Sequence, residues 1–308
     1  MAISTERTSA GPGTPASNGA GASPGLDVMA VAVAGGRFQD DLRAVKMVWK
    51  RELIRYARNR IRIVTSLAQP VLFLFVLGSG LSPIVSSSSG PHVSFVTFMF
   101  PGVIAMTILF TAIFSAVSIV WDREFGFLRE MMVAPVRRGA LVTGKTLGGA
   151  TVATSQGIIM LLLGPIAGVP FNMVTLVEMV LLMVLCSLML TAIGVVAASR
   201  MQQVESFQVV MQLFVLPMFF LAGAIFPLTG LPTWLSILTK VDPLAYIVDP
   251  MRRAVFDHLN VSKAAVAKFS PGLHWGSWKL PVWPELAIVV AITFGCLWVA
   301  VAMFSKQD

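Results

Sequence analysis

The sequence contains few charged residues for its length. Only 12% of its 308 residues are Asp, Glu, Lys or Arg, whereas 56% are hydrophobic and the mean hydropathy is +0.80. Soluble domains carry about 25% charged residues. No charged residue occurs between Ile63 and Trp121. This scarcity argues against a soluble globular protein and predicts an all-α, polytopic membrane protein.

Cysteine and histidine are also scarce. Cys186 and Cys296 lie within apolar stretches, which is typical of small buried side chains and not of a disulfide framework. His92, His258 and His274 have no metal-ligand spacing, so we expect no metal site. No cluster of acids, histidines or nucleophiles collects in one region, which argues against a membrane-bound enzyme.

The first 36 residues lack the apolar h-region of a signal peptide and are rich in Gly, Ala, Ser, Thr and Pro. We expect residues 1–36 to form a disordered cytoplasmic tail. Residues 37–308 then form one transmembrane domain.

Six segments are long and apolar enough for membrane-spanning helices, which need about 20 predominantly apolar residues. They are approximately residues 63–81, 94–120, 145–169, 173–199, 204–226 and 285–304. The connection between the fifth and sixth segments is cut by four prolines into pieces too short to span, yet it is too apolar for a free loop. Short re-entrant helices that dip into the outer leaflet fit this pattern.

Basic residues indicate the orientation. With six spans, the two termini lie on the same side of the membrane. Seventeen of the 23 Lys and Arg residues lie on that side: in the N-terminal region, in the loop between spans two and three, after span four (Arg200) and after span six (Lys306). By the positive-inside rule both termini are cytoplasmic, and the protein belongs to a bacterial-type cell membrane. The net charge of +8 is explained in this way, so we expect no nucleic-acid partner.

The segment 40–62 precedes the first span and is amphipathic. Its apolar residues recur at spacings of three and four, with basic residues largely on the other faces. This predicts an interfacial helix on the inner leaflet. It serves either as an anchor held by anionic lipid or also as part of the site for a cytoplasmic partner. The candidate residues are Trp49, Lys50, Arg51, Leu53, Arg55 and Tyr56.

Residues 139–146 match the phosphate-loop pattern GxxxxGK[ST]. Such a loop requires a buried strand before it and a soluble domain around it, whereas this one is followed by an apolar span. We therefore interpret Lys145 as a basic residue at a span boundary and the glycines as a turn, and expect no nucleotide or other cofactor in this chain.

The loop from Trp121 to Met132 combines charges of both signs with Phe and Met at helical spacing. This spacing predicts a short amphipathic helix. Pro135 ends the helix, because the residue before a proline disfavours the helical conformation. A surface loop with lipid-facing aromatics is one interpretation. A docking helix for a cytoplasmic protein is the other, and we favour it because exposed aromatics accompany the charges.

Two stretches resemble the membrane subunits of ABC-2 type transporters, especially the daunorubicin-resistance exporter permeases: residues 122–149 (DREFGFLREMMVAPVRRGALVTGKTLGG) and residues 220–253. The resemblance implies that the first cytoplasmic loop is a coupling helix seated on a separate ATPase subunit. The implied contacts are Asp122, Arg123, Glu124, Phe125, Gly126, Phe127, Arg129 and Glu130.

The resemblance also implies two membrane subunits and two ATPase subunits, with ATP and Mg²⁺ bound by the ATPase. It implies that re-entrant helices close the outer end of the pathway. The residues concerned are Phe226, Pro227, Leu231, Pro232, Trp234, Pro243 and Tyr246.

Glu178 and Gln212 are polar residues within predicted spans, so they are candidates for the substrate pathway, although Glu178 is shallow enough to reach the headgroups. The expected function is ATP-driven export of an amphipathic drug-like or lipid substrate. A permease for polysaccharide or lipid-linked glycan is the alternative. A secondary transporter is less favoured, since it needs charged relays or repeated halves.

Overall fold

Helices account for most of the described chain. The computed structural model describes residues 38–86, 94–126, 137–169, 172–228, 231–259, 269–275 and 278–305, so the predicted tail 1–36 lies outside it. In chain order the elements are α1 (Phe38–Arg58), α2 (Arg60–Leu72), the π-helical turn η1 (Phe73–Leu77), α3 (Gly78–Ser86), α4 (Phe95–Ser115), α5 (Val117–Glu124), α7 (Arg138–Leu161), α8 (Met173–Ala198), α9 (Val204–Leu221), α10 (Thr233–Val241), α11 (Ala245–Asp257), β1 (His274–Trp275), β2 (Trp278–Lys279) and α13 (Val282–Ser305).

Five helical stretches in the described part of the chain are long and apolar enough to cross a membrane. They are Arg60–Ser82, Phe95–Glu124, Met173–Ala198, Val204–Leu221 and Val282–Ser305. The all-α membrane fold is therefore confirmed. The remaining predicted span, 145–169, corresponds to α7, which begins earlier at Arg138 and is richer in Gly and Thr. Since α7 does not meet the same apolarity criterion, the count of six spans stays a prediction.

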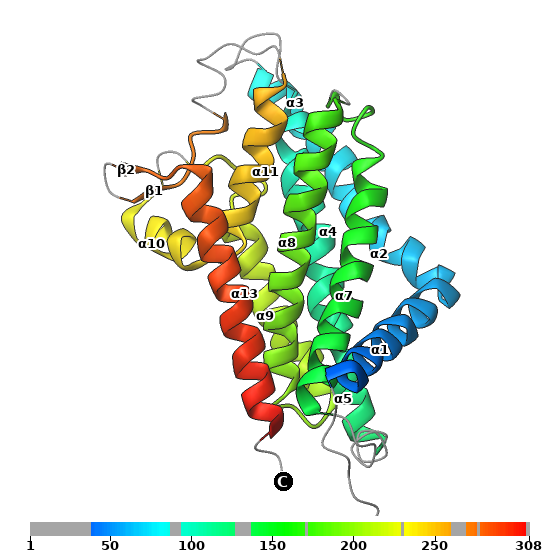
Figure 1. Ribbon diagram of the computed structural model, residues 1–308. Helices are drawn as coiled ribbons and strands as arrows, with labels where there is room; N and C mark the ends of the chain where they lie inside the picture. The colour runs from blue at the N-terminus through cyan, green and yellow to red at the C-terminus, as the bar shows by residue number, and fades with distance from the viewer. Residues whose placement is uncertain are drawn as a thin grey trace, which may run out of the picture. The chain divides into compact units, whose positions relative to one another are not determined.

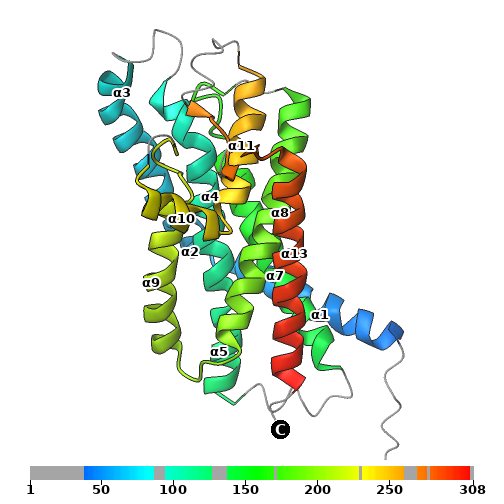
Figure 2. The ribbon, with the colours of Figure 1, turned by 90° about the vertical axis from the view of Figure 1, so that its left-hand side faces the viewer.

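The core is formed by α4, α7 and α8. Helix α4 is buried along most of its length, and it lies between α9 on one side and α7 and α8 on the other (Figure 2). A helix that is apolar on all sides is typical of such a central position. By contrast, α9 buries a single stripe, formed by Phe207, Met211, Val215 and Phe219 at four-residue spacing.

Helix α1 runs obliquely across α7 and is not aligned with the bundle (Figure 1). The bundle end that holds α1, α5 and the C-terminus of α13 is called the α1 end below, and α11 and α3 lie toward the opposite end (Figure 1). Asn59 separates α1 from α2. Its side chain accepts a hydrogen bond from the backbone N–H of Arg62 and so caps the first spanning helix.

The connection after α9 contains two short helices, α10 and α11, as the prolines predicted, and also a small antiparallel pairing of β1 with β2 that the sequence did not suggest. The Tyr246 hydroxyl of α11 donates a hydrogen bond of 2.6 Å to the Lys240 carbonyl, which joins the two helices. Whether α10 and α11 re-enter a bilayer stays a prediction.

Helix α11 carries charges that the sequence analysis did not select. Arg252 is only 1% exposed, donates to the Gly223 carbonyl at 2.5 Å and lies over the ring of Phe98 at 4.3 Å. Its neighbour Arg253 pairs with Asp249 and, at 2.9 Å, with the fully buried Glu285 of α13. These contacts fix α11 against α4 and α13.

The packing of α4 leads to a first prediction, at Gly102. A Cβ atom there would lie 2.5 Å from the Ala224 carbonyl oxygen and 2.6 Å from the Ala224 Cα, and backbone atoms cannot rotate away. We expect Gly102→Ala to cost about 1–3 kcal/mol of stability and to lower the melting temperature of the purified protein by several degrees. Gly295→Ala is the control, since its Cβ would meet nothing within 4 Å. Equal melting temperatures for the two variants would contradict this packing.

Candidate functional site

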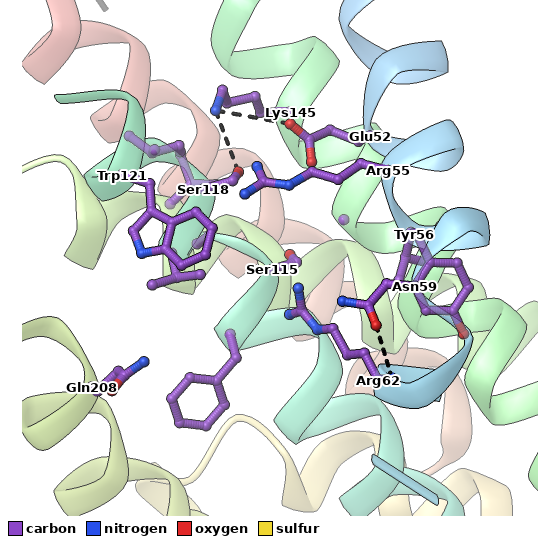
Figure 3. Close-up of a pocket in the computed structure, with 17 residues that line it drawn as sticks. Glu52, Arg55, Tyr56, Asn59, Arg62, Ser115, Ser118, Trp121, Lys145 and Gln208 are labelled. Atoms are coloured by element: carbon purple, nitrogen blue, oxygen red, sulfur yellow. Dashed lines mark hydrogen bonds and ion pairs between the residues drawn. The ribbon is translucent and has the colours of Figure 1, made fainter. Parts of the chain in front are cut away.

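Four charged side chains form a closed ring at the α1 end. Arg51 of α1 contacts Glu52 at 3.3 Å and Asp122 of α5 at 3.0 Å. Lys145 of α7 contacts Asp122 at 2.5 Å. Figure 3 shows its other two contacts, with Glu52 at 3.9 Å and with the Ser118 hydroxyl at 3.3 Å. The ring joins three helices that are far apart in sequence.

Two members of the ring are almost fully buried. Lys145 is 7% exposed and Asp122 is 8% exposed. Removing a charged group from water costs several kcal/mol unless it is paired. With two cations and two anions the ring is neutral, so each buried charge has a partner. Burial alone would lower the pKa of Arg51, but the carboxylates of Asp122 and Glu52 outweigh this effect and raise the pKa above its ordinary value.

Helix α1 can reach the ring because α7 presents glycines to it. A Cβ on Gly144 would lie 2.9 Å from the Val48 Cβ, and one on Gly148 would lie 2.8 Å from the Glu52 Cβ. The Trp49 indole N–H donates to the Thr151 hydroxyl at 3.0 Å in the next turn of α7. Small residues four apart on a helix permit this close approach.

These contacts correct the interpretation of the phosphate-loop letters. The glycines were expected to form a turn, but Gly139 and Gly144 lie within α7. The position of Lys145 at a span boundary stays a prediction, and its side chain is buried in the ring. Helix packing therefore explains Gly144, which lies four residues before Gly148 and faces α1 with it, whereas Gly139 faces Val301 of α13.

Two further residues of the predicted coupling segment bond to other helices. Arg123 donates to the carbonyls of Ser199 at 3.0 Å and Met201 at 2.9 Å, in the turn after α8. The Glu124 carboxylate accepts a hydrogen bond of 2.9 Å from the Val204 N–H, the first residue of α9. An acidic group at this position satisfies a free amide and complements the helix dipole.

The remaining predicted coupling residues are less constrained. Phe125 is 67% exposed, and Gly126 has a φ of +80°, a conformation that favours glycine. An open groove of about 570 Å³ lies between α1 and α5, lined by Arg51, Ile54, Arg55, Arg58, Trp121, Asp122 and Phe125. Phe127, Arg129 and Glu130 lie outside the described residues.

The predicted interfacial residues divide between two surroundings. Trp49, Leu53 and Tyr56 are partly buried on the side of α1 that packs on α7, whereas Lys50 is exposed. The Arg55 guanidinium lies over the Trp121 ring at 5.0 Å. Part of the stripe expected to face lipid therefore contacts α7.

The residues proposed for a substrate pathway do not converge. Glu178 and Gln212 are exposed on α8 and α9, respectively. At the opposite end, Phe226, Pro227, Leu231 and Pro243 are partly buried, Pro232 and Trp234 are exposed, and Tyr246 is buried. The roles predicted for both groups stay predictions.

Comparison with known proteins agrees with this arrangement. The family model described as "ABC-2 type transporter" matches residues 43–256, which is more than two thirds of the chain and runs from α1 to the end of α11. The chain belongs to the ABC-2 type transporter family. It is accordingly the membrane-spanning subunit of an ABC transporter, and subunits of this family generally pair with an ABC ATPase.

The relatives of this ABC-2 subunit include proteins that are named as transport permeases. It is 26% identical over 207 residues to the putative transport permease ycf38 of Cyanophora paradoxa, covering 66% of this chain and 71% of that protein. Nodulation protein J of Rhizobium leguminosarum bv. viciae is 28% identical over 212 residues, covering 67% and 79%. The probable multidrug ABC transporter permease YbhR of Escherichia coli (strain K12) is 26% identical over 231 residues, covering 73% of this chain and 56% of that protein.

Sequence reasoning about the ABC-2 subunit selected Asp122 and Arg51 but did not pair them, and it missed Glu52. The sequence did contain an indication that α1 packs closely on α7. The spacing Gly144-x-x-x-Gly148 marks a close helix contact, and an amphipathic helix was already predicted nearby.

The ring leads to a second prediction, a double-mutant cycle on the pair that is most buried. Lys145→Met leaves Asp122 buried without its nearest cation, and we expect a loss of about 3–5 kcal/mol, seen as a melting temperature lower by on the order of 10 °C. Combining it with Asp122→Asn should recover a large part of this loss, because neither buried charge then remains. Simple addition of the two single-variant losses would contradict a coupled buried pair.

Proposed function

We propose that the chain is the membrane subunit of an ATP-driven exporter in which a separate ATPase docks beside α5. The observation that carries the proposal is the bonding of three consecutive residues. Asp122 bonds to α1 and α7, Arg123 to the end of α8, and Glu124 to the start of α9. A displacement of this segment would therefore be transmitted to four helices: α1, α7, α8 and α9.

The docking position follows from what these bonds leave exposed. Asp122, Arg123 and Glu124 are engaged within the chain, so direct contact with the ATPase falls to Phe125, the Gly126 turn and the residues that follow. The groove beside Phe125 has arginines and an exposed Ile54 along α1. Aromatic groups and arginine are enriched in protein interfaces. On this proposal the α1 end is cytoplasmic, and ATP and Mg²⁺ belong to the partner.

The proposed assembly contains two copies of this chain and two ATPase subunits. The surface of α9 that faces away from α4 supports a second copy, because Val209, Leu213, Phe214 and Phe220 are all exposed there. A second copy or lipid covers such a face.

The proposed substrate is an amphipathic drug-like molecule or a lipid, moved outward across the cell membrane. Two observations support it: the "multidrug" name of one relative and the aliphatic composition of the spans. Export of polysaccharide or lipid-linked glycan is the alternative, and it would favour an aromatic-lined pathway.

A third prediction tests docking with Phe125→Ala. The side chain is mostly exposed, so its removal should leave the melting temperature of the isolated subunit unchanged. We expect at least about tenfold weaker binding of the ATPase subunit, since an exposed aromatic at the centre of an interface contributes about 2 kcal/mol or more. Titration of the purified ATPase into the detergent-solubilised subunit measures this.

The matched control is Phe294→Ala, because Phe294 is 68% exposed but lies on α13 within a spanning helix. Undiminished ATPase binding by Phe125→Ala, or an equal loss with Phe294→Ala, would refute docking at this segment.

A further inference from the structure

A second feature of the α1 end is a cavity of about 400 Å³ at the joint between α1 and α2. Figure 3 shows the Arg55 and Arg62 side chains directed into it, with Asn59, Tyr56 and Trp121 around the rim. The cavity lies next to the charged ring, since Glu52 and Lys145 form part of its wall.

The cavity has an excess of positive charge. The carboxylates of Glu52 and Asp122 are both taken up by Lys145 and Arg51, so the ring contributes no net charge. Within the described chain Arg55 and Arg62 form no ion pair, and Arg55 contacts the Trp121 ring instead. Asn59 uses its Oδ1 to cap α2, which leaves its Nδ2 group as a further donor. Two cations and an amide donor thus face one space, a donor set suited to a phosphate group.

A second cavity of about 210 Å³ continues from the first along α2. The two share Tyr56, Arg62, Phe114 and Val152, and the second extends to Phe110 and Pro70. At 1.5 Å per residue, Arg62 and Pro70 are roughly 12 Å apart along the helix. The combined space is therefore basic at one end. Farther along, these aromatic and aliphatic side chains line it together with the uncharged polar side chains of Thr65, Ser66, Gln69, Thr111 and Gln156.

The basic end lies at the start of the first helical stretch that is long and apolar enough to cross a membrane, where lipid headgroups are expected. The first spanning stretch begins at Arg60, one turn or less from Asn59 and Arg62. Basic pockets between helices on the cytoplasmic side are suited to anionic headgroups. The second cavity has no charged lining residue beyond Arg62, and it runs along α2 in the direction that an acyl chain takes from such a headgroup.

We propose that these cavities hold an anionic glycerophospholipid of the inner leaflet, with its phosphate between Arg55 and Arg62 and one acyl chain along Phe110 and Pro70. The lipid joins α1 to α2 and lies against Trp121, directly beside the ring. It is a resident structural lipid, and the proposal does not depend on which substrate the transporter moves.

The experiment uses the full chain alone in a neutral detergent, titrated with palmitoyl-oleoyl phosphatidylglycerol or with the matching phosphatidylcholine. Native mass spectrometry counts bound lipid, and the melting temperature reports stabilisation. We expect phosphatidylglycerol to bind at least about tenfold more tightly than phosphatidylcholine and to raise the melting temperature. The double variant Arg55→Gln with Arg62→Gln should lose this preference, because each guanidinium–phosphate contact is a charge-assisted hydrogen bond.

The matched control is Lys46→Gln with Lys50→Gln, which removes the same charge from exposed positions of α1 outside both cavities. It should retain the preference. Val152→Phe is an independent variant that fills the space where the cavities meet while keeping both arginines, and it should also weaken binding.

Three results would overturn the proposal. Equal binding of the two lipids would remove the anion preference, and equal losses in the two double variants would place the effect outside this cavity. Stabilisation by glycerol 1-phosphate as strong as that by phosphatidylglycerol, with no effect of Val152→Phe, would reduce the site to one for a free phosphate ester. Because no ATPase is present, none of these outcomes bears on the proposed coupling function.

Discussion

The buried ion pair between Lys145 and Asp122 is the interaction on which the rest of the α1 end depends. Two charges removed from water are tolerated only when each is paired and their remaining hydrogen-bonding groups are satisfied. Arg51 and Glu52 complete that requirement, and both come from α1. Helix α1 must therefore lie close to α7, and Gly144 and Gly148 supply the space for it.

The same constraint fixes the position of the last turn of α5. Asp122 belongs to the ring, while Arg123 and Glu124 attach to the two ends of the turn between α8 and α9. In an ABC-2 subunit this arrangement makes residues 122–124 a junction between helices, and it leaves Phe125 exposed for the proposed contact with the ATPase. In the proposed function, a residue that contacts the partner and residues that bond to other helices then lie next to each other in the sequence, with separate roles.

The sequence predicted the features that depend on local pattern. Long apolar runs identified the five stretches that could cross a membrane, the spacing of Trp49 and Tyr56 identified α1, and prolines divided the connection into α10 and α11. The turn expected at Gly139 and Gly144 was wrong, because Arg138 and Lys145 resemble a loop in a hydropathy profile although both lie in α7 and Lys145 is paired inside the fold.

Pairings between distant residues could not be derived from local periodicity. Arg51 and Asp122 are 71 positions apart, and Arg253 and Glu285 are 32 positions apart. Nothing in one sequence indicates that these charges meet. The bonds of Asp122, Arg123 and Glu124 to other helices were missed for the same reason, since their charges alone suggested a free surface.

The most direct test of the account measures whether the junction transmits movement. Spin labels at Lys50→Cys on α1 and Glu205→Cys on α9, in a background without Cys186 and Cys296, report the distance between these helices in complexes diluted with unlabelled subunit. The account predicts that ATP and vanadate change this distance in the assembled transporter. It also predicts that Arg123→Met combined with Glu124→Gln abolishes the change while the ATPase still binds. A distance change of the same size in this variant would contradict the account.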